Sequence, residues 1–273
     1  MSTALVNLLD ATFAKLKASG KTALIPFITV GDPDPETTLD ILAVLEQAGA
    51  DIVELGVPYS DPLADGPVIQ RASERALAHQ ITVETCIQTA VKAKARGIKL
   101  PFVLFTYYNP VLQMELPRFF DLLREAGISG LIIPDLPYEE AAEVLELADD
   151  ANVRLIPLVA PTSSGRITQI LARARGFVYC VSSLGVTGER ASFHASVDEF
   201  IASVKAETDL PVAVGFGISN REQVERFADI CDGAVVGSAI VRKIEETLPL
   251  LGSESSKEQG LLQIRDFVAQ LRV

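Results

Sequence analysis

The chain has 273 residues, of which 48% are hydrophobic, and its formal net charge is -12. This length and apolar content suit a single domain with a large core, so we expect one domain over residues 1–273. Because no cluster of Lys or Arg offsets the acidic charge, neither nucleic acid nor an anionic membrane is expected as a partner.

Membrane insertion is not expected either, since no apolar run reaches the roughly 18 residues of a membrane span. The first residues lack the layout of a signal peptide and of a transit peptide. We therefore expect a cytoplasmic protein, or one of the plastid stroma if the source is a plant or an alga.

The cysteines and histidines predict no metal centre. Cys86, Cys180 and Cys231 are far apart and form no CxxC pair, which is typical of reduced thiols rather than of a disulfide framework or a zinc site. The only two histidines, His79 and His194, are too few for a His-rich site, and we interpret them as surface or loop residues.

Along the chain, residues 3–19 come first and place Leu and Phe side chains on one helical face. This extra N-terminal helix precedes the first strand, where it could plug the end of a barrel or lie against its side. Apolar, β-branched runs then predict strands at 24–30, 51–57, 101–108, 130–135, 153–160, 176–183, 211–217 and 232–237. Helices are predicted after them at about 35–47, 69–78, 83–96, 116–126, 138–150, 164–173, 196–206 and 220–228, and a last one after a polar linker at 252–257.

Eight strands followed by helices in about 250 residues favour an α/β fold of the (β/α)₈ TIM-barrel type. The strands are nearly continuous apolar runs, as expected when both faces of a parallel sheet are covered. An open doubly wound sheet is the alternative, but no GxGxxG motif follows the first strand.

Two carboxylates follow each other near the end of the second strand. Glu54 lies within an apolar run, where a lone carboxylate must be neutral, paired or used in chemistry. Asp65, on the loop that follows, could complete an acid/base pair. Two structural alternatives stay open at this point: a buried partner could satisfy Glu54, and Asp65 could be a turn or cap residue before Pro67.

Other polar residues follow strands at the edge where barrel active sites are built. They are Asp32, Tyr107, Asn109, Asp135, Tyr179 and the loop 182–190. Tyr179 could equally be a core residue, and the role of Asp135 stays open.

Glycine-rich loops follow the last strands at 215–219 and 236–239, and a third lies at 185–188. Glycine lets backbone N–H groups approach an anion, and the next helix adds the positive end of its dipole. Barrels commonly bind phosphate after strands seven and eight, so a phosphate site is favoured over simple turns.

Several motifs together resemble the tryptophan synthase alpha chain family. They are 26–33 (PFITVGDP), 54–70 (ELGVPYSDPLADGPVIQ), 107–110 (YYNP), 134–137 (PDLP), 185–188 (GVTG) and 215–218 (GFGI). The resemblance covers about residues 20–250 and keeps the family's order. It implies retro-aldol cleavage of indole-3-glycerol phosphate to indole and glyceraldehyde 3-phosphate in L-tryptophan biosynthesis.

The same resemblance implies roles for individual residues. Glu54 is expected to be the general acid/base, with a raised pKa, while a more solvated Asp65 stays ionised and accepts the indole N–H. Tyr179 is expected to support the site, and Thr187, on a loop that closes over the substrate, to reach Asp65. Phe27 and Phe216 are expected to pack on the indole, and the phosphate to be bound by Gly188, Gly217, Gly237 and Ser238.

The family works with a beta chain in an assembly of two alpha and two beta chains. That partner carries pyridoxal phosphate, whereas no cofactor or metal is expected on this chain. The loop around Asp61 and Pro62 is expected to face the partner. Two other functions remain as alternatives: a free-standing indole-3-glycerol-phosphate lyase, and a non-catalytic phosphate-binding subunit.

Overall fold

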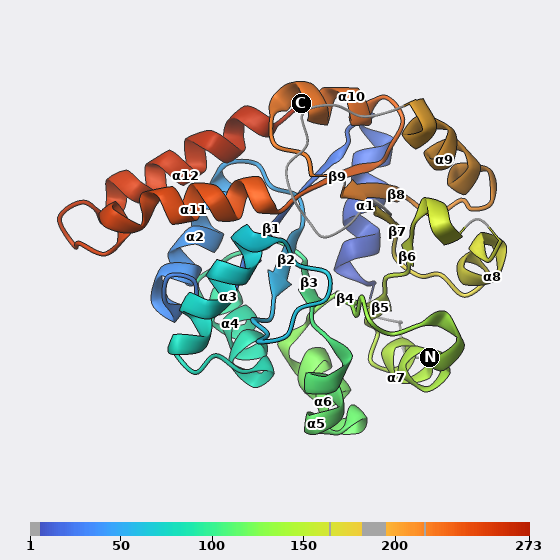
Figure 1. Ribbon diagram of the computed structural model, residues 1–273, viewed down its shortest axis with the longest axis horizontal. Coiled ribbons are helices and arrows are strands. Elements are labelled where there is room, and N and C mark those ends of the chain that lie inside the picture. The colour runs from blue at the N-terminus through green and yellow to red at the C-terminus, as the bar shows by residue number, and fades with distance from the viewer. Residues whose placement is uncertain (1–5, 164, 182–194, 216) are drawn as a thin grey trace.

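The computed structural model describes residues 6–163, 165–181, 195–215 and 217–273. Its strands form one parallel sheet in the order β5-β4-β3-β2-β1-β9-β8-β7-β6, which curls into an inner ring (Figure 1). The strands are β1 (Ala23–Thr29), β2 (Val53–Gly56), β3 (Phe102–Phe105), β4 (Gly130–Ile132), β5 (Arg154–Leu155), β6 (Leu158–Val159), β7 (Val178–Val181), β8 (Val212–Gly215) and β9 (Gly233–Val236). The predicted barrel is therefore confirmed.

The fifth predicted strand, 153–160, is broken into β5 and β6, which occupy the two ends of the strand order. Ile156 and Pro157, the two residues between β5 and β6, still hydrogen-bond to the neighbouring strands β4 and β7. Ile156 donates its N–H to the carbonyl of Leu131 (2.9 Å), and the carbonyl of Pro157 accepts from the N–H of Tyr179 (3.0 Å). Because Pro157 has no N–H of its own, the ladder is interrupted there while the ring still closes.

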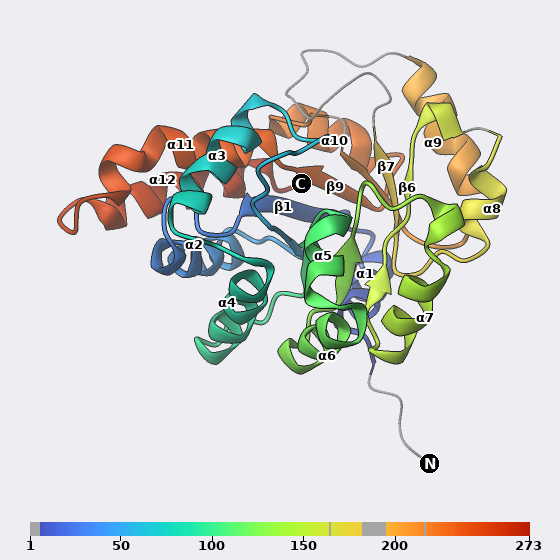
Figure 2. The ribbon, with the colours of Figure 1, turned by 60° about the horizontal axis from the view of Figure 1, so that its bottom comes forward.

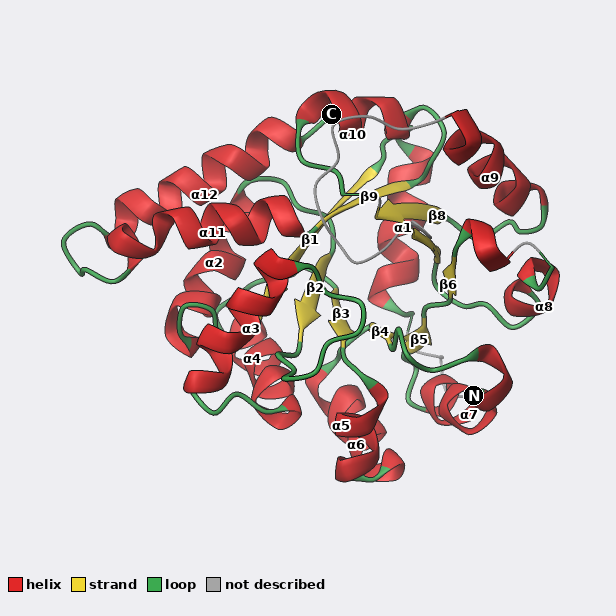
Figure 3. Ribbon diagram, viewed as in Figure 1, coloured by secondary structure: helices red, strands yellow, loops and turns green. Residues whose placement is uncertain are grey.

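Helices surround the ring of strands (Figure 3). They are α1 (Leu8–Ala18), α2 (Pro35–Gln47), α3 (Pro67–Ala78), α4 (Val83–Ala95), α5 (Tyr108–Met114), α6 (Leu116–Ala126), α7 (Ala142–Asp150), α8 (Ile167–Leu171), α9 (Ala195–Ala206), α10 (Arg221–Ala228), α11 (Ser238–Leu251) and α12 (Lys257–Leu271). Short 3₁₀ turns lie at Tyr138–Glu140 and Pro161–Ser163. The helix expected over 164–173 is only the five residues of α8.

Helix α5 was not predicted, and its cause is a contact that is distant in sequence. Its first backbone N–H, that of Tyr108, donates to the carboxylate of Asp135 at 2.9 Å. Asp135 follows β4, so it satisfies an N-terminal N–H of a helix that follows β3. This contact gives Asp135 a structural role.

Helix α1 fills one end of the ring. Its buried side chains Leu9, Phe13 and Leu16 pack in one cluster with inward-facing strand residues, among them Ile25, Ile52, Val103, Ile132, Phe177 and Val235. The plug position, one of the two expected for this helix, is therefore the one observed.

Successive side chains along a strand alternate between two apolar clusters. Ile52 belongs to the cluster inside the ring, whereas Val53 and Leu55 belong to the cluster between strands and helices. Because side chains of a strand alternate, Glu54 faces the inside of the barrel together with Ile52. Within the described parts of the chain, none of the helices is long and apolar enough to cross a membrane.

Candidate active site

A cavity lies inside the barrel at the carboxyl ends of its strands. It brings together residues from six strands and from the loops and helices after them: Phe27, Glu54, Asp65, Ile69, Phe105, Tyr179, Gly215, Gly217, Val235, Gly237 and Ser238. Most of the site residues expected from the sequence are in this set, and Phe105 and Ile69 join them. The alternation of β3, with Val103 facing inward, could have revealed Phe105.

Glu54 is almost completely buried, with 1% of its surface exposed. Burial raises the pKa of its carboxyl group to about 8, because the charged form loses its hydration. Its Oε1 is buried and has no hydrogen-bond partner among the described residues. A protonated carboxyl group therefore faces the cavity at neutral pH, and no buried partner for this oxygen is found in the described parts of the chain.

Asp65 is buried as well, with 6% of its surface exposed. Burial raises the pKa of its carboxyl group to about 6, and a hydrogen bond from Tyr107 opposes this rise. Asp65 is therefore more exposed than Glu54, as expected, although it is itself buried. The order of the two carboxyl pKa values is still the expected one, so at pH 7 Asp65 is mostly ionised and Glu54 mostly protonated.

Tyr107 holds the loop that carries Asp65. Its hydroxyl accepts the backbone N–H of Ala64 at 3.0 Å and also hydrogen-bonds the carboxylate of Asp65. Its ring stacks on that of Tyr59, with 4.9 Å between the ring centroids. The sequence named Tyr107 only as one polar residue after a strand, since no local spacing relates it to Asp65.

Tyr179 faces Glu54 from β7. Burial first, and then the charge of Glu54, raise the pKa of its hydroxyl well above the ordinary value. The hydroxyl also lies against Gly215, where an added Cβ would overlap it. Tyr179 therefore remains a proton donor at the edge of the cavity, and it belongs to the inner core at the same time.

Aromatic side chains form one wall of the cavity. The rings of Phe27 and Phe105 meet edge to face, with their centroids 5.6 Å apart. The ring of Phe27 also covers Gly56, where a Cβ would overlap it. A flat, apolar ligand fits such a wall.

Glycines and the start of a long helix form another part of the cavity lining. Gly217 has a φ of +78°, a conformation that favours glycine. Helix α11 begins at Ser238 and has 14 residues, so its first N–H groups lie beside Gly237 and the cavity. Such a terminus suits an anion.

Three expected site residues, Thr187, Gly188 and Phe216, lie outside the described residues. Asp61 and Pro62 line a separate surface pocket rather than the cavity, together with Tyr59 and Leu63. No group of three His, Cys, Asp or Glu side chains within the described ranges is close enough to hold a metal ion. The three cysteines are buried and free.

Comparison with known proteins gives a consistent result. A family model described as tryptophan synthase alpha chain matches residues 13–271. The tryptophan synthase alpha chain of Bacillus subtilis (strain 168) is 54% identical over 243 residues, which is 89% of this chain and 91% of that protein. That of Geobacillus sp. (strain WCH70) is 49% identical over 251 residues, which is 92% of this chain and 95% of that protein.

Solved structures agree with the sequence relatives. Tryptophan synthase subunit alpha of Legionella pneumophila str. Paris superposes with a TM-score of 0.87 at 35% identity, covering 98% of this chain and 97% of that one. A chain in a structure of Mycobacterium tuberculosis tryptophan synthase gives 0.86 at 36% identity, covering 96% of both chains.

Proposed function

The chain belongs to the tryptophan synthase alpha chain family, and we propose that it cleaves indole-3-glycerol phosphate with Glu54 as general acid/base and Asp65 as acceptor of the indole N–H. The reaction is a retro-aldol cleavage to indole and glyceraldehyde 3-phosphate, so the protein is a lyase of L-tryptophan biosynthesis. The observation that carries the residue assignment is the buried Glu54, whose Oε1 has no described partner and whose pKa is about 8.

Proton transfer starts from the protonated carboxyl group of Glu54. It delivers its proton to C3 of the indole ring, and the ring nitrogen gains positive charge. Asp65, ionised at pH 7, stabilises that charge through a hydrogen bond from the N–H.

Carbon–carbon cleavage completes the reaction. Glu54, now a carboxylate, takes the proton of the glycerol hydroxyl on the carbon attached to C3. As the aldehyde forms, the electrons of the C–C bond return to the ring and neutralise its nitrogen. The proton count balances, and a group with a pKa near the working pH suits both transfers.

The remaining groups bind and orient the substrate. Phe27 and Phe105 pack on the indole, Phe216 is proposed to do the same, and Tyr179 donates a hydrogen bond beside Glu54. Thr187 is proposed to reach Asp65 when its loop closes. The phosphate is bound by backbone N–H groups at Gly188, Gly217 and Gly237, by Ser238 and by the N-terminus of α11.

A beta chain is the proposed partner, in an assembly of two alpha and two beta chains. Several solved relatives are described as tryptophan synthase, and the curated relatives are named alpha chains, which supports a subunit over a free-standing lyase. Asp61 and Pro62, on the surface beside the cavity mouth, are proposed to face this partner. The proposed chemistry needs no cofactor on this chain, with pyridoxal phosphate carried by the beta chain, and the cytoplasm is the proposed location.

Indole release from indole-3-glycerol phosphate tests this function, with and without a matching beta chain, for the wild type and Glu54→Gln. Release that rises with the beta chain and is lost in the variant supports the proposal. Full release without the beta chain supports the free-standing lyase instead. No release by the folded wild type in either condition contradicts the proposed substrate.

A further inference from the structure

The position of Asp65 depends on helix α3. Asp65 immediately precedes Gly66, and the helix begins at Pro67. From the first turn of this helix, the side-chain amide of Gln70 donates to the backbone carbonyl of Asp65 at 2.8 Å. Any shift of the first turns of α3 therefore moves the catalytic carboxylate that we assign to Asp65.

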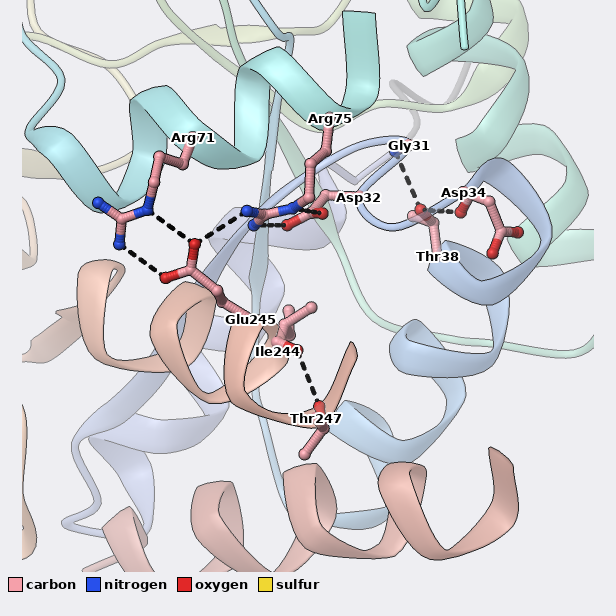
Figure 4. Close-up of polar contacts among 9 residues, drawn as sticks. All are labelled: Gly31, Asp32, Asp34, Thr38, Arg71, Arg75, Ile244, Glu245 and Thr247. Carbon is pink, nitrogen blue, oxygen red and sulfur yellow. Dashed lines mark hydrogen bonds and ion pairs between the residues drawn. The ribbon is translucent and has the colours of Figure 1, made fainter. Parts of the chain in front are cut away.

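Two arginines of α3 bind carboxylates of other elements (Figure 4). Arg75 holds both carboxylate oxygens of Asp32, through Nε at 2.7 Å and Nη2 at 2.9 Å. Its Nη1 also donates to Glu245 at 2.9 Å. Arg71, one turn earlier, holds the same Glu245 through two hydrogen bonds of 2.8 and 2.7 Å.

The three elements joined by Arg75 each contribute to the cavity. Asp32 follows β1, which carries Phe27, and Glu245 lies on α11, which begins with Ser238. Helices α3 and α11 lie side by side in both Figure 1 and Figure 2. Arg75 is thus the one described side chain that bonds directly to both the β1 end and α11 from α3.

An apolar cluster lies between the same three elements. It consists of Phe27 from β1, Val68, Ile69 and Ala72 from α3, and Val241 from α11, all buried. Apolar contacts of this kind hold the elements together but leave sliding between them inexpensive, since they are not directional. The fork of Arg75 adds fixed geometry, because a guanidinium and a carboxylate bind in one plane.

The burial of Asp32 makes its partner Arg75 difficult to replace. Asp32 has 2% of its surface exposed, and 1% of its side chain. Burial raises the pKa of Asp32, and the two hydrogen bonds from Arg75 oppose this effect. Without Arg75, Asp32 would be a buried carboxylate without its cation. Either the end of β1 would then have to rearrange or Asp32 would have to take up a proton.

We propose that Arg75 is a positioning residue: by binding Asp32 and Glu245 together, it fixes α3 against β1 and α11 and so holds Asp65 at the distance from the phosphate end that cleavage requires. This inference rests on the proposed function for its kinetic effect. Its structural part, the fixed position of the first turns of α3, is independent of that function.

Arg75→Met tests the proposal, because it keeps the length of the side chain and removes the fork. Misplacement of a reacting group by about 1 Å lowers turnover up to roughly 100-fold, so we expect kcat to fall about 10- to 100-fold and KM to change less than threefold. Displacement of Asp65 toward water lowers its pKa, so the acid limb of the kcat profile moves from near pH 6 to lower pH. Arg75→Lys, which keeps one donor and the charge, recovers part of kcat.

Arg96→Met is the matched control. Arg96 also binds two carboxylates, Glu36 and Asp40, but both of these lie on α2 and neither lies on α3 or α11. The kcat of Arg96→Met is expected to stay within twofold of the wild-type value, and its pH profile is expected to be unchanged. Amide hydrogen exchange over residues 59–72 and 238–247 gives a readout without substrate, and exchange there rises in Arg75→Met alone.

The outcomes separate the two proposals. Faster exchange in Arg75→Met together with an inactive wild type supports the positioning role and contradicts the proposed substrate. An active wild type with unchanged exchange, kcat and pH profile in Arg75→Met overturns the positioning role. Equal losses in Arg75→Met and Arg96→Met, in proportion to lost thermal stability, overturn it as well.

Discussion

Glu54 on β2 and Tyr179 on β7 face each other from opposite sides of the barrel, four strands apart in the sheet order. The charge of Glu54, after burial, raises the pKa of the Tyr179 hydroxyl, so the two groups share one electrostatic environment. A carboxyl group with a pKa of about 8 thus has a neutral proton donor as its neighbour rather than a cation. Burial, with no cation among the described residues beside the carboxyl group to oppose it, favours the protonated form of Glu54 in the resting enzyme.

Glu54→Gln is expected to lower indole release by about 100- to 10,000-fold, the usual contribution of a general acid/base. It is also expected to stabilise the fold at high pH. The pKa of Glu54 is about 8 in the folded protein and near 4.5 when exposed. Between these values the folded state binds more protons than the unfolded state, so wild-type stability falls as pH rises.

The neutral amide in Glu54→Gln removes this loss of folding stability, which is on the order of 4 kcal/mol at pH 8. Urea unfolding at pH 4 and pH 8 measures it. The variant and the wild type should differ little at pH 4 and the variant should be the more stable at pH 8. A difference that does not change with pH would contradict the raised pKa of Glu54.

Tyr107→Phe is expected to raise the pKa of Asp65 above about 6, because the hydrogen bond that stabilises the carboxylate is lost. Since Asp65 acts as the ionised form, the acid limb of kcat/KM should move to higher pH, with a several-fold loss at pH 6. A pH profile of indole release measures this shift. Tyr59→Phe is the control, since it keeps the ring that stacks on Tyr107. An identical shift in both variants would argue against the hydrogen bond from Tyr107 as the cause.

Gly215→Ala is expected to displace Tyr179, whose hydroxyl and ring edge occupy the space of the new Cβ. Overpacking of this kind costs about 1–3 kcal/mol of stability, and kcat should fall about tenfold because the donor beside Glu54 moves. Thermal unfolding and steady-state kinetics measure the two effects. Gly252→Ala is the control, because a Cβ there meets only the carbonyl of Leu248 at 3.4 Å. Wild-type kinetics in Gly215→Ala would contradict a role for the Tyr179 position.

Gly237→Ala tests the phosphate end. A Cβ at this position finds its nearest neighbour, the Cβ of Phe27, at an ordinary 3.6 Å, so the chain should fold. The methyl group would occupy space beside the N-terminus of α11, where we place the phosphate. The KM for indole-3-glycerol phosphate should therefore rise about tenfold or more, with a smaller change in kcat. Titration with glyceraldehyde 3-phosphate gives a second measure, and unchanged affinity for both would place the phosphate elsewhere.

The barrel and the mouth that holds the site could be predicted from the sequence because both depend on local patterns. Apolar strands alternate with helices along the chain. Glu54 lies two residues after Ile52 in the same strand, so both side chains face the inside of the barrel. Glycine before a helix likewise identified the Gly237–Ser238 end.

What escaped prediction depends on residues that are distant in sequence. The bond that starts α5 joins Tyr108 to Asp135, and Arg75 binds partners 43 and 170 residues away. The hydrogen bond between Tyr107 and Asp65 has the same origin, because Tyr107 follows the third strand and Asp65 follows the second. No local periodicity records such contacts.

Helix α1 closes the floor of the barrel with Leu9, Phe13 and Leu16, packed against the inward side chains of the strands. Among the described residues, the cavity therefore has no route toward that side. Indole formed beside Glu54 must diffuse outward past the strand ends, where the segment with Asp61 and Pro62 lies on the surface. Because α1 closes the other end of the barrel, the product leaves on the side of the mouth. A protein bound over the mouth would receive the indole before the indole reaches the solvent.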